Sequence, residues 1–193
     1  MTMERIGLFG GSFDPVHLGH LLVARAALEE VGLRRVFFIP AAQSPFKPNR
    51  EPAPGPQRLR LLRLALAGMT ECEVDGQELA RGGVSYTIET VRRYAADYPR
   101  ADLHYVVGAD HVASLPQWRE AEALARCARF IVVPRPDAGG VSLPPPFQGV
   151  PLKGFPLAVS SSQIRDRVRA GLPIDLFTGA AVAEVIHKNR LYL

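Results

Sequence analysis

The segment that decides the fold is Arg5-Ile6-Gly7-Leu8-Phe9-Gly10-Gly11-Ser12-Phe13-Asp14-Pro15-Val16-His17-Leu18-Gly19-His20. Its first part, residues 5–9, is a short apolar run that ends at a glycine pair, which predicts a buried strand. Residues 18–31 carry apolar side chains at helical spacing, and Gly32 stands where it would end that helix. A strand, a glycine turn and a helix in this order predict a turn that binds phosphate at a helix N-terminus.

Beyond this segment, strand-like and helix-like patterns alternate along the chain. Further strands are predicted at 36–39, 71–79 (weakly), 103–107 and 130–133, and helices at 59–69, 87–98, 118–127, about 162–170 and about 181–189. The alternation predicts an α/β fold, a Rossmann-like doubly wound parallel sheet with helices on both faces. Ligands of such sheets bind beyond the carboxyl ends of the strands. We therefore expect the loops after Phe9, Ile39, Val107 and Val133 to converge.

The length of 193 residues suits a single domain. We expect an α/β core over about 1–158 and a small C-terminal helical subdomain over about 159–193. Seven prolines from Pro134 to Pro156 predict a long irregular connection between these two parts.

Composition narrows the class of protein only moderately. The net charge of +4 is compatible with a nucleic-acid binder, but the basic residues are spread along the chain without an aromatic RNA-binding motif, so we expect no nucleic-acid partner. The two cysteines, Cys72 and Cys127, predict neither a disulfide framework nor a zinc site. No signal peptide or membrane span is recognisable, which makes the cytoplasm the expected location.

His17 and His20 are the most informative polar residues of the first segment. Three positions apart in the first turn of a helix, they face the same way. A protonated histidine there opposes the helix dipole, and an anion between the two rings would reverse that effect. The alternative is a purely structural histidine pair. A metal site is not indicated, because two ligands are too few.

A second motif, Val159-Ser160-Ser161-Ser162-Gln163-Ile164-Arg165, stands near the C-terminus. Ser160 and Gln163 fit a capping box, which explains the serines structurally. The capping box leaves Arg165 unexplained, since a positive charge is disfavoured near a helix start. A bound phosphate would account for it, because a guanidinium group binds phosphate through two parallel hydrogen bonds.

Together these motifs resemble those of the nucleotidyltransferase superfamily that carries His-x-Gly-His. Here that motif is His17-Leu18-Gly19-His20, and 159–165 is similar to the superfamily's Ile-Ser-Ser-Thr-x-Ile-Arg motif, with Val159 and Ser162 as the departures. The middle of the chain resembles the nicotinate-nucleotide adenylyltransferase family within that superfamily. The similar segments are Pro45-Phe46-Lys47, with Phe46 in place of a histidine, Ser85-Tyr86-Thr87, Gly108-Ala109-Asp110, Trp118-Arg119 and Pro134-Arg135-Pro136.

Each segment of the middle region also has a structural alternative. Thr87 could cap a helix, Trp118 could be a buried aromatic residue at a helix start, and Asp110 could cap the helix that follows it. The functional interpretation rests on their joint order. A pyridine ring binds well to an aromatic partner, which Trp118 would supply. Its carboxylate binds well to N–H donors at a helix start, which the segment 85–87 would supply.

The resemblance implies an enzyme of NAD biosynthesis. It would transfer AMP from ATP to nicotinate mononucleotide and release deamido-NAD and pyrophosphate, with Mg²⁺ arriving on ATP and no metal site on the protein. The implied catalytic residues are His17, His20 and Arg165; the ATP-binding residues are Gly10, Gly11, Ser12, Phe13, Gly108, Asp110, Ser160, Ser161 and Ser162; the acceptor-binding residues are Lys47, Ser85, Tyr86, Thr87, Trp118 and Arg135.

Three alternatives remain open from the sequence. The acceptor could instead be nicotinamide mononucleotide or phosphopantetheine. A catalytically silent nucleotide-binding or RNA-binding module could also use this fold, because a fold alone does not fix a function. The sequence does not indicate an oligomeric state.

Overall fold

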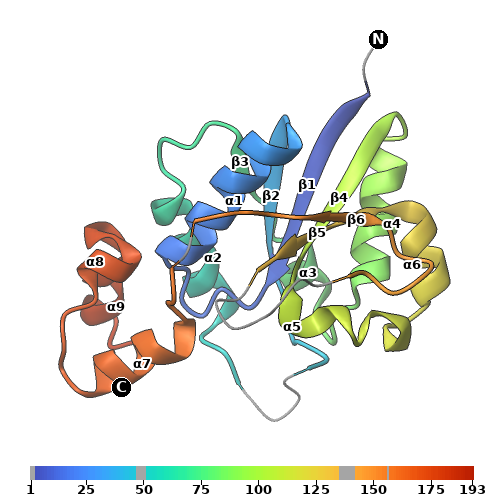
Figure 1. Ribbon diagram of the computed structural model, residues 1–193. Helices are drawn as coiled ribbons and strands as arrows, with labels where there is room; N and C mark the ends of the chain where they lie inside the picture. Colours follow the sequence, from blue (N-terminus) through green and yellow to red (C-terminus); the bar gives the residue numbers. More distant parts are fainter. Residues whose placement is uncertain (1–2, 47–50, 135–141, 156) are drawn as a thin grey trace.

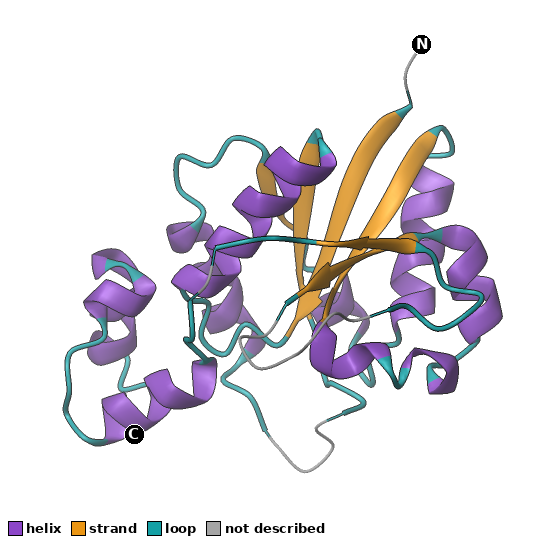
Figure 2. Cartoon of the chain, in the orientation of Figure 1, coloured by secondary structure: helices purple, strands orange, loops and turns teal. Residues whose placement is uncertain are grey.

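The structure, a computed structural model, describes residues 3–46, 51–134, 142–155 and 157–193. The described part contains one six-stranded sheet in the order β3-β2-β1-β4-β5-β6, and every neighbouring pair is parallel. The strands are β1 (Glu4–Gly11), β2 (Arg35–Pro40), β3 (Cys72–Val74), β4 (Ala101–Gly108), β5 (Arg129–Val133) and β6 (Gly149–Pro151). This arrangement confirms the predicted Rossmann-like α/β fold (Figures 1 and 2).

Helices cover both faces of the sheet. They are α1 (Leu18–Val31), α2 (Gly55–Ala65), α3 (Gln77–Arg81), α4 (Thr87–Asp97), α5 (Ala109–Val112), α6 (Ala121–Cys127), α7 (Ser161–Arg169), α8 (Asp175–Thr178) and α9 (Ala180–Lys188), with a 3₁₀ turn at Leu115–Gln117. Side chains alternate along each strand. Phe9 and Phe38 pack with α1 and α2, whereas the neighbouring Leu8 and Phe37 pack with α4 and α6.

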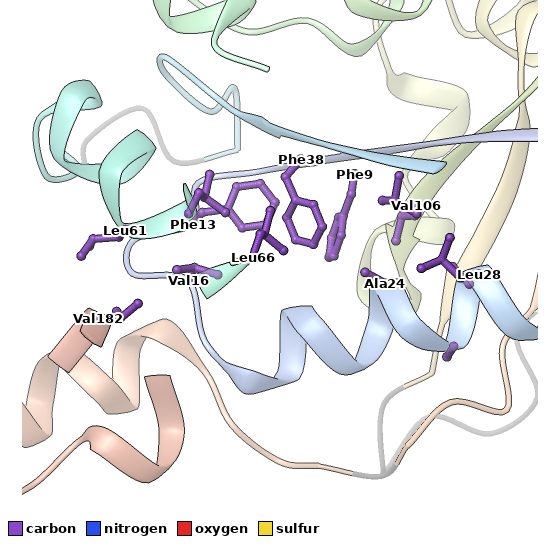
Figure 3. Packing of buried hydrophobic residues seen from close by; sticks show 14 of the residues in the cluster. Phe9, Phe13, Val16, Ala24, Leu28, Phe38, Leu61, Leu66, Val106 and Val182 are labelled. Atoms are coloured by element: carbon purple, nitrogen blue, oxygen red, sulfur yellow. The ribbon is translucent and has the colours of Figure 1, made fainter. Parts of the chain in front are cut away.

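The core on the α1 face extends into the C-terminal helices. Phe9, Phe13 and Phe38 form a group of rings with centroids 5.2–5.5 Å apart, a normal spacing for aromatic pairs. Val182 of α9 and Ile164 of α7 belong to the same buried cluster, and Figure 3 shows Val182 beside Leu61 and Val16. The C-terminal helices therefore share a hydrophobic core with the α/β part.

The strand order places a topological switch point between β1 and β4. Strand β1 pairs with β2 on one side and with β4 on the other, and the connections leave in opposite directions. Gly11 lies opposite Pro40, and Gly108 lies opposite Val133, so these carboxyl ends share one edge of the sheet. The four strand ends that precede the predicted loops therefore meet as expected, and the loop after Val133 lies largely outside the described residues.

Two elements before residue 100 differ from the sequence-based expectation. The helix expected at 59–69 is α2, which begins at Gly55 with Pro56 as its second residue, a position where the missing proline N–H costs nothing. The strand expected at 71–79 is confined to Cys72–Val74, and α3 follows it. Its edge position needs only a few main-chain pairs, so its sequence signal is weak.

Two elements after residue 100 also differ. Trp118 was expected inside a helix, but it ends the 3₁₀ turn in an extended conformation. Glu120 then takes a left-handed conformation, with φ of 52°, before α6 begins at Ala121. The stretch expected to be irregular contains β6, where Gly149 passes so close to Phe130 that a Cβ atom would lie 1.9 Å from its carbonyl oxygen. That strand is recognisable only from its pairing.

Candidate active site

The two histidines of the first motif lie at the start of α1, at the carboxyl edge of the sheet. His17 is the residue that precedes the helix, and His20 is the third residue within it. Their rings stack with centroids 3.7 Å apart and an interplanar angle of 29°. The His17 side chain is largely buried. The structure therefore brings both predicted catalytic histidines together, facing the same way.

A hydrogen bond defines which nitrogen of the neutral His20 ring carries the proton. Its Nδ1 accepts the backbone N–H of His17 at 3.2 Å, so in the neutral ring the proton resides on Nε2. This geometry sharpens the argument from the helix dipole. His20 does not need a positive charge to bind an anion, because its Nε2–H is already oriented as a donor by the other ring nitrogen.

Gly19 makes room for the histidine pair. A Cβ atom at Gly19 would lie 3.0 Å from His17 Nδ1 and 3.0 Å from Val159 Cγ1. Both distances are tighter than ordinary van der Waals contact, so any larger residue would displace the ring or the second motif. The glycine between the two histidines is therefore explained by close packing rather than by an unusual backbone conformation.

The buried side chain of Phe13 packs against the ring of His20. Its side chain is 2% exposed, and its ring meets the His20 ring edge-on at 4.9 Å. The left-handed backbone at Phe13, with φ of 45°, turns this ring into the core and stores strain of about 1 kcal/mol or more. Any contact between this residue and ATP would therefore be made by its backbone.

The second motif is bonded directly to the first, although they are about 145 residues apart. Ser161 Oγ donates to the carbonyl oxygen of Pro15 at 2.8 Å, and Arg165 Nη1 donates to the carbonyl oxygen of Asp14 at 2.7 Å. The expected capping box is also present, with Ser160 N–H donating to Gln163 Oε1 and Gln163 N–H to Ser160 Oγ. The serines have a structural role, and the two predicted phosphate-binding motifs form one region.

Arg165 is largely buried and its charge faces an acidic residue of the first motif. The fifth residue of α7, it donates from Nη2 to Ser162 Oγ at 2.8 Å, and its Nη1 lies 4.0 Å from Asp14 Oδ2. Asp14 is itself 2% exposed. This carboxylate is an anion within the protein that accounts for the position of Arg165, an explanation that the sequence alone did not suggest.

Arg58 is a buried residue of the site whose role the sequence analysis missed. It is 2% exposed on the inner face of α2 and donates to the carbonyl oxygens of Ser12 (2.8 Å), Ala41 (2.7 Å) and Ala53 (2.8 Å). Burial lowers the pKa of this guanidinium, and the nearby Asp14 opposes that effect. The signal was present in the sequence, because Arg58 lies on the same helical face as Leu61 and Leu62.

These contacts define the phosphate side of the site, which consists of residues 10–20, Arg58 and residues 159–165. The opposite part, the acceptor side, consists of residues 42–46, 85–87, Tyr105 and residues 118–119. On that side Ala42 N–H donates to Ser85 Oγ at 2.9 Å, and Ser85 N–H donates to the Gln43 carbonyl oxygen at 2.9 Å. The loop after β2 is therefore anchored to the segment that begins α4.

Tyr105 is the acceptor-side residue that reaches the phosphate side, and sequence analysis did not select it. Its hydroxyl accepts from Thr87 Oγ1 at 3.3 Å and occupies the space beside Gly10, where a Cβ atom would be 2.5 Å away. Burial raises the pKa of Tyr105 to about 12, so the hydroxyl stays neutral. Thr87 is the first residue of α4 and Tyr86 precedes it, so the alternative that Thr87 caps this helix is wrong.

Aromatic rings gather on the acceptor side. Trp118 is half-buried, meets Tyr105 edge-on at 6.1 Å, and donates from Nε1 to Ser114 Oγ at 3.3 Å. Phe46 lies 5.4 Å from the Trp118 ring and 5.0 Å from the His111 ring. Trp118 is therefore neither inside a helix nor fully buried, and part of its ring packs against the buried cluster around β4 and α4.

The start of α4 carries the remaining acceptor-side residues. Arg119 lies over the Tyr86 ring at 4.4 Å and pairs with Glu89 at 3.1 Å.

The predicted ATP-binding residues Gly108 and Asp110 lie at the end of β4. Gly108 precedes α5, and a Cβ atom there would lie 2.4 Å from Asp110 Oδ1. The Asp110 carboxylate thus folds back over Gly108 and lies 3.8 Å from His111 Nε2.

Two predicted acceptor-binding residues, Lys47 and Arg135, lie outside the described residues. Among the residues that are described, there is no group of three or more His, Cys, Asp or Glu side chains that could hold a metal ion. Within the same residues, no helix is both long enough and apolar enough to span a membrane.

Comparison with known proteins decides the family. The model of the cytidylyltransferase-like family matches residues 8–167, which include both the His-x-Gly-His segment and the second motif. A probable nicotinate-nucleotide adenylyltransferase of Gloeobacter violaceus is 40% identical over 98% of this chain and 96% of its own length. One from Opitutus terrae is 38% identical over 97% of both chains. This chain belongs to the nicotinate-nucleotide adenylyltransferase family.

Solved structures of nicotinate-nucleotide adenylyltransferases have the same fold. The nicotinic acid mononucleotide adenylyltransferase of Plasmodium falciparum, solved in complex with NaAD, aligns with a TM-score of 0.79 over 98% of this chain and 97% of its own, at 16% identity. A putative nicotinate-nucleotide adenylyltransferase of Vibrio parahaemolyticus aligns with a TM-score of 0.68 and 21% identity, over 98% of this chain and 96% of its own. These alignments cover the C-terminal helices as well as the sheet.

Proposed function

We propose that this protein transfers AMP from ATP to nicotinate mononucleotide, with deamido-NAD and pyrophosphate as products. The observation that carries the proposal is the joined pair of motifs at the switch point. His17 and His20 stand at the start of α1, and the start of α7 is bonded to the loop before them. Two helix N-termini and two histidine rings form a region suited to a polyphosphate.

The chemistry needs positioning more than acid–base catalysis. The nucleophile is a phosphate oxygen of nicotinate mononucleotide, which is ionised at neutral pH. It attacks the α-phosphorus of ATP, and the bond from that phosphorus to the bridging oxygen of pyrophosphate breaks. No proton has to be removed from the nucleophile, so the protein contributes orientation and stabilisation of the developing charge.

On the phosphate side, His20 Nε2–H and His17 donate to the phosphate oxygens during transfer. The backbone N–H groups of Gly11 and Ser12 and those at the start of α7 face the β- and γ-phosphates. Arg165 adds its charge to that region while Asp14 and Ser162 hold its orientation. Arg58 keeps the loop after β1 in place through its bond to Ser12.

On the acceptor side, Trp118 stacks on the pyridine ring and the start of α4 receives its carboxylate. Ser85, Tyr86 and Thr87 form that helix start, and Ser85 is held by the loop after β2. Gly108 and Asp110 hold the sugar of ATP. Lys47 and Arg135 stay predictions from the family resemblance. The cytoplasmic location stays a prediction from the sequence.

Mg²⁺ enters as part of the substrate, bound to the phosphates of ATP. This ion prefers phosphate oxygens and water and needs few protein ligands.

The proposal is tested by measuring pyrophosphate release from ATP with three separate acceptors. Nicotinate mononucleotide should support turnover, nicotinamide mononucleotide should be a much poorer acceptor, and phosphopantetheine should be inactive. A carboxylate gains from the positive helix start and an amide does not. Equal use of both mononucleotides would contradict the predicted acceptor, and no release with any of them would indicate a silent nucleotide-binding module.

A further inference from the structure

Phe46 is the residue in which this chain departs from the histidine of the resembling family motif. It stands in the loop after β2, and its side chain is 47% exposed, which is unusual for a phenylalanine outside a contact surface. Nothing in the adenylyl-transfer chemistry described above uses this ring. Its contacts therefore need a separate explanation.

The contacts of Phe46 are with residues from two other parts of the site. Its ring centroid lies 5.4 Å from that of Trp118, at an interplanar angle of 44°, and 5.0 Å from that of His111. Trp118 is held from its own side by Tyr105 and by the bond to Ser114. Phe46 thus approaches an indole ring that is already fixed to the body of the protein.

The loop that carries Phe46 is attached close to this residue. Gln43, three positions earlier, bridges to Val84 and accepts the N–H of Ser85. The N–H of Phe46 itself donates to Ser44 Oγ at 3.3 Å. The same contacts that position the start of α4 therefore determine where Phe46 stands, so the ring is placed together with the predicted carboxylate site.

The acceptor's ring has a charge that suits such surroundings. The ring nitrogen of nicotinate mononucleotide is bonded to ribose, so the ring is a quaternary pyridinium cation. Cations of this kind bind well to aromatic faces, with tryptophan the strongest and phenylalanine weaker. A protonated histidine at position 46 would repel the pyridinium ring, whereas a phenylalanine attracts it at any pH.

The distance between the Phe46 and Trp118 rings also indicates how the pyridine ring of the acceptor would bind. Aromatic carbon atoms in contact are about 3.5 Å apart, so a ring between two parallel faces requires about 7 Å between their centroids. The distance from Phe46 to Trp118 is 5.4 Å. The two rings are therefore too close to hold a third ring between them. The exposed Phe46 has to shift outward when a ligand enters.

We propose that Phe46 is an acceptor-binding residue that forms a second aromatic wall on the acceptor side and binds the pyridinium face opposite Trp118. The inference rests on the proposed function and names a residue for it. It predicts that affinity for the acceptor depends on the aromatic character of residue 46 and not on its apolar volume alone.

The test uses Trp118, which is the one tryptophan in the sequence, as an internal probe. Its fluorescence is titrated with nicotinate mononucleotide in the full-length protein and in three variants. Phe46→Ala should shift the emission of the unliganded protein to longer wavelength and raise Kd about tenfold, and Phe46→Leu should raise Kd about fivefold. Phe46→Tyr keeps the aromatic face and should stay within about twofold of the original protein.

Turnover distinguishes this role from a general structural one. The kcat at saturating acceptor should stay within about threefold in every variant, because Phe46 does not face the transferred phosphate, and the melting temperatures should stay close together. A Phe46→Leu variant that binds the acceptor like the original protein would overturn the inference. If the original protein fails to release pyrophosphate with nicotinate mononucleotide, the proposed function itself fails, and that result is separate from unchanged affinity in an active enzyme.

Discussion

The phosphate side and the acceptor side meet at the same sheet edge but are built differently. The phosphate side is held by buried charged residues, since Arg58 and Asp14 are each 2% exposed and bond to backbone groups of other loops. On the acceptor side, Phe46 is 47% exposed and its side chain contacts the rings of Trp118 and His111. The phosphate geometry is therefore fixed before ATP arrives, whereas the acceptor side includes an exposed ring that can shift.

This difference matches what each half has to do. In-line transfer at phosphorus tolerates little misplacement, and preorganised donors give most of the stabilisation. Recognition of a flat pyridinium ring depends on contact area and aromatic faces, which tolerate small shifts. If the comparison is correct, changes on the phosphate side should affect stability and kcat, and changes on the acceptor side should affect KM.

The largest effect is expected from Arg58→Leu. It leaves three carbonyl oxygens and Asp14 without their buried cationic partner, so the free energy of unfolding should fall by about 3–5 kcal/mol. Urea denaturation measures this change. Arg60→Leu is the matched control on the exposed face of the same helix and should stay within about 0.5 kcal/mol. Equal stability of the two variants would break the comparison.

His20→Ala should come next, with a loss of about 10²-fold or more in kcat. It removes the oriented Nε2–H donor, and loss of one such donor from a preorganised site has this magnitude. Steady-state pyrophosphate release gives the value, and His187→Ala, on the exposed end of α9, is the control. An activity within threefold of the original enzyme would count against the role of His20.

Trp118→Leu tests the acceptor side of the comparison. Removal of the aromatic face should raise KM for nicotinate mononucleotide about tenfold, with KM for ATP within about twofold and little change in stability. Trp118→Phe keeps an aromatic face and should lose much less. Equal increases in both KM values would show that Trp118 is not confined to the acceptor side.

The smallest effect is expected at His104, which serves as a reference outside both sides. Burial lowers the pKa of His104 below its ordinary value, while Asp102 opposes this and Arg5 and Arg129 add to it. A lowered pKa means that the unfolded chain binds the proton more readily, so this contribution is present above about pH 6.5 and is lost as the pH falls. Urea denaturation between pH 7.5 and 5 should show this loss, and His104→Gln should reduce it. A steeper loss in His104→Gln would contradict the assignment.

The sequence predicted the elements whose signal is local. The helix from 18 to 31 and its glycine end were predicted at the correct residues because periodicity and the left-handed Gly32 act within the segment itself. The meeting of the carboxyl ends of β1, β2, β4 and β5 at one edge followed from the predicted parallel order of the strands.

The features that the sequence did not predict depend on distant partners. Arg58 is buried because three carbonyl groups from separate loops surround it, and Arg165 faces Asp14 because α7 packs against the loop after β1. Strand β6 contains a glycine and a proline and is held by pairing with β5. In each case the cause is tertiary, and no short window of sequence contains it.

The most direct test of the transfer itself follows the phosphorus atoms of ATP. The enzyme is incubated with nicotinate mononucleotide and ATP labelled with ³²P at either the α- or the γ-phosphate, and the products are separated by chromatography. We predict that the α-label appears in the pyridine dinucleotide and the γ-label appears in pyrophosphate. Recovery of the γ-label in the pyridine product, or no transfer of the α-label by a folded enzyme, would contradict the account.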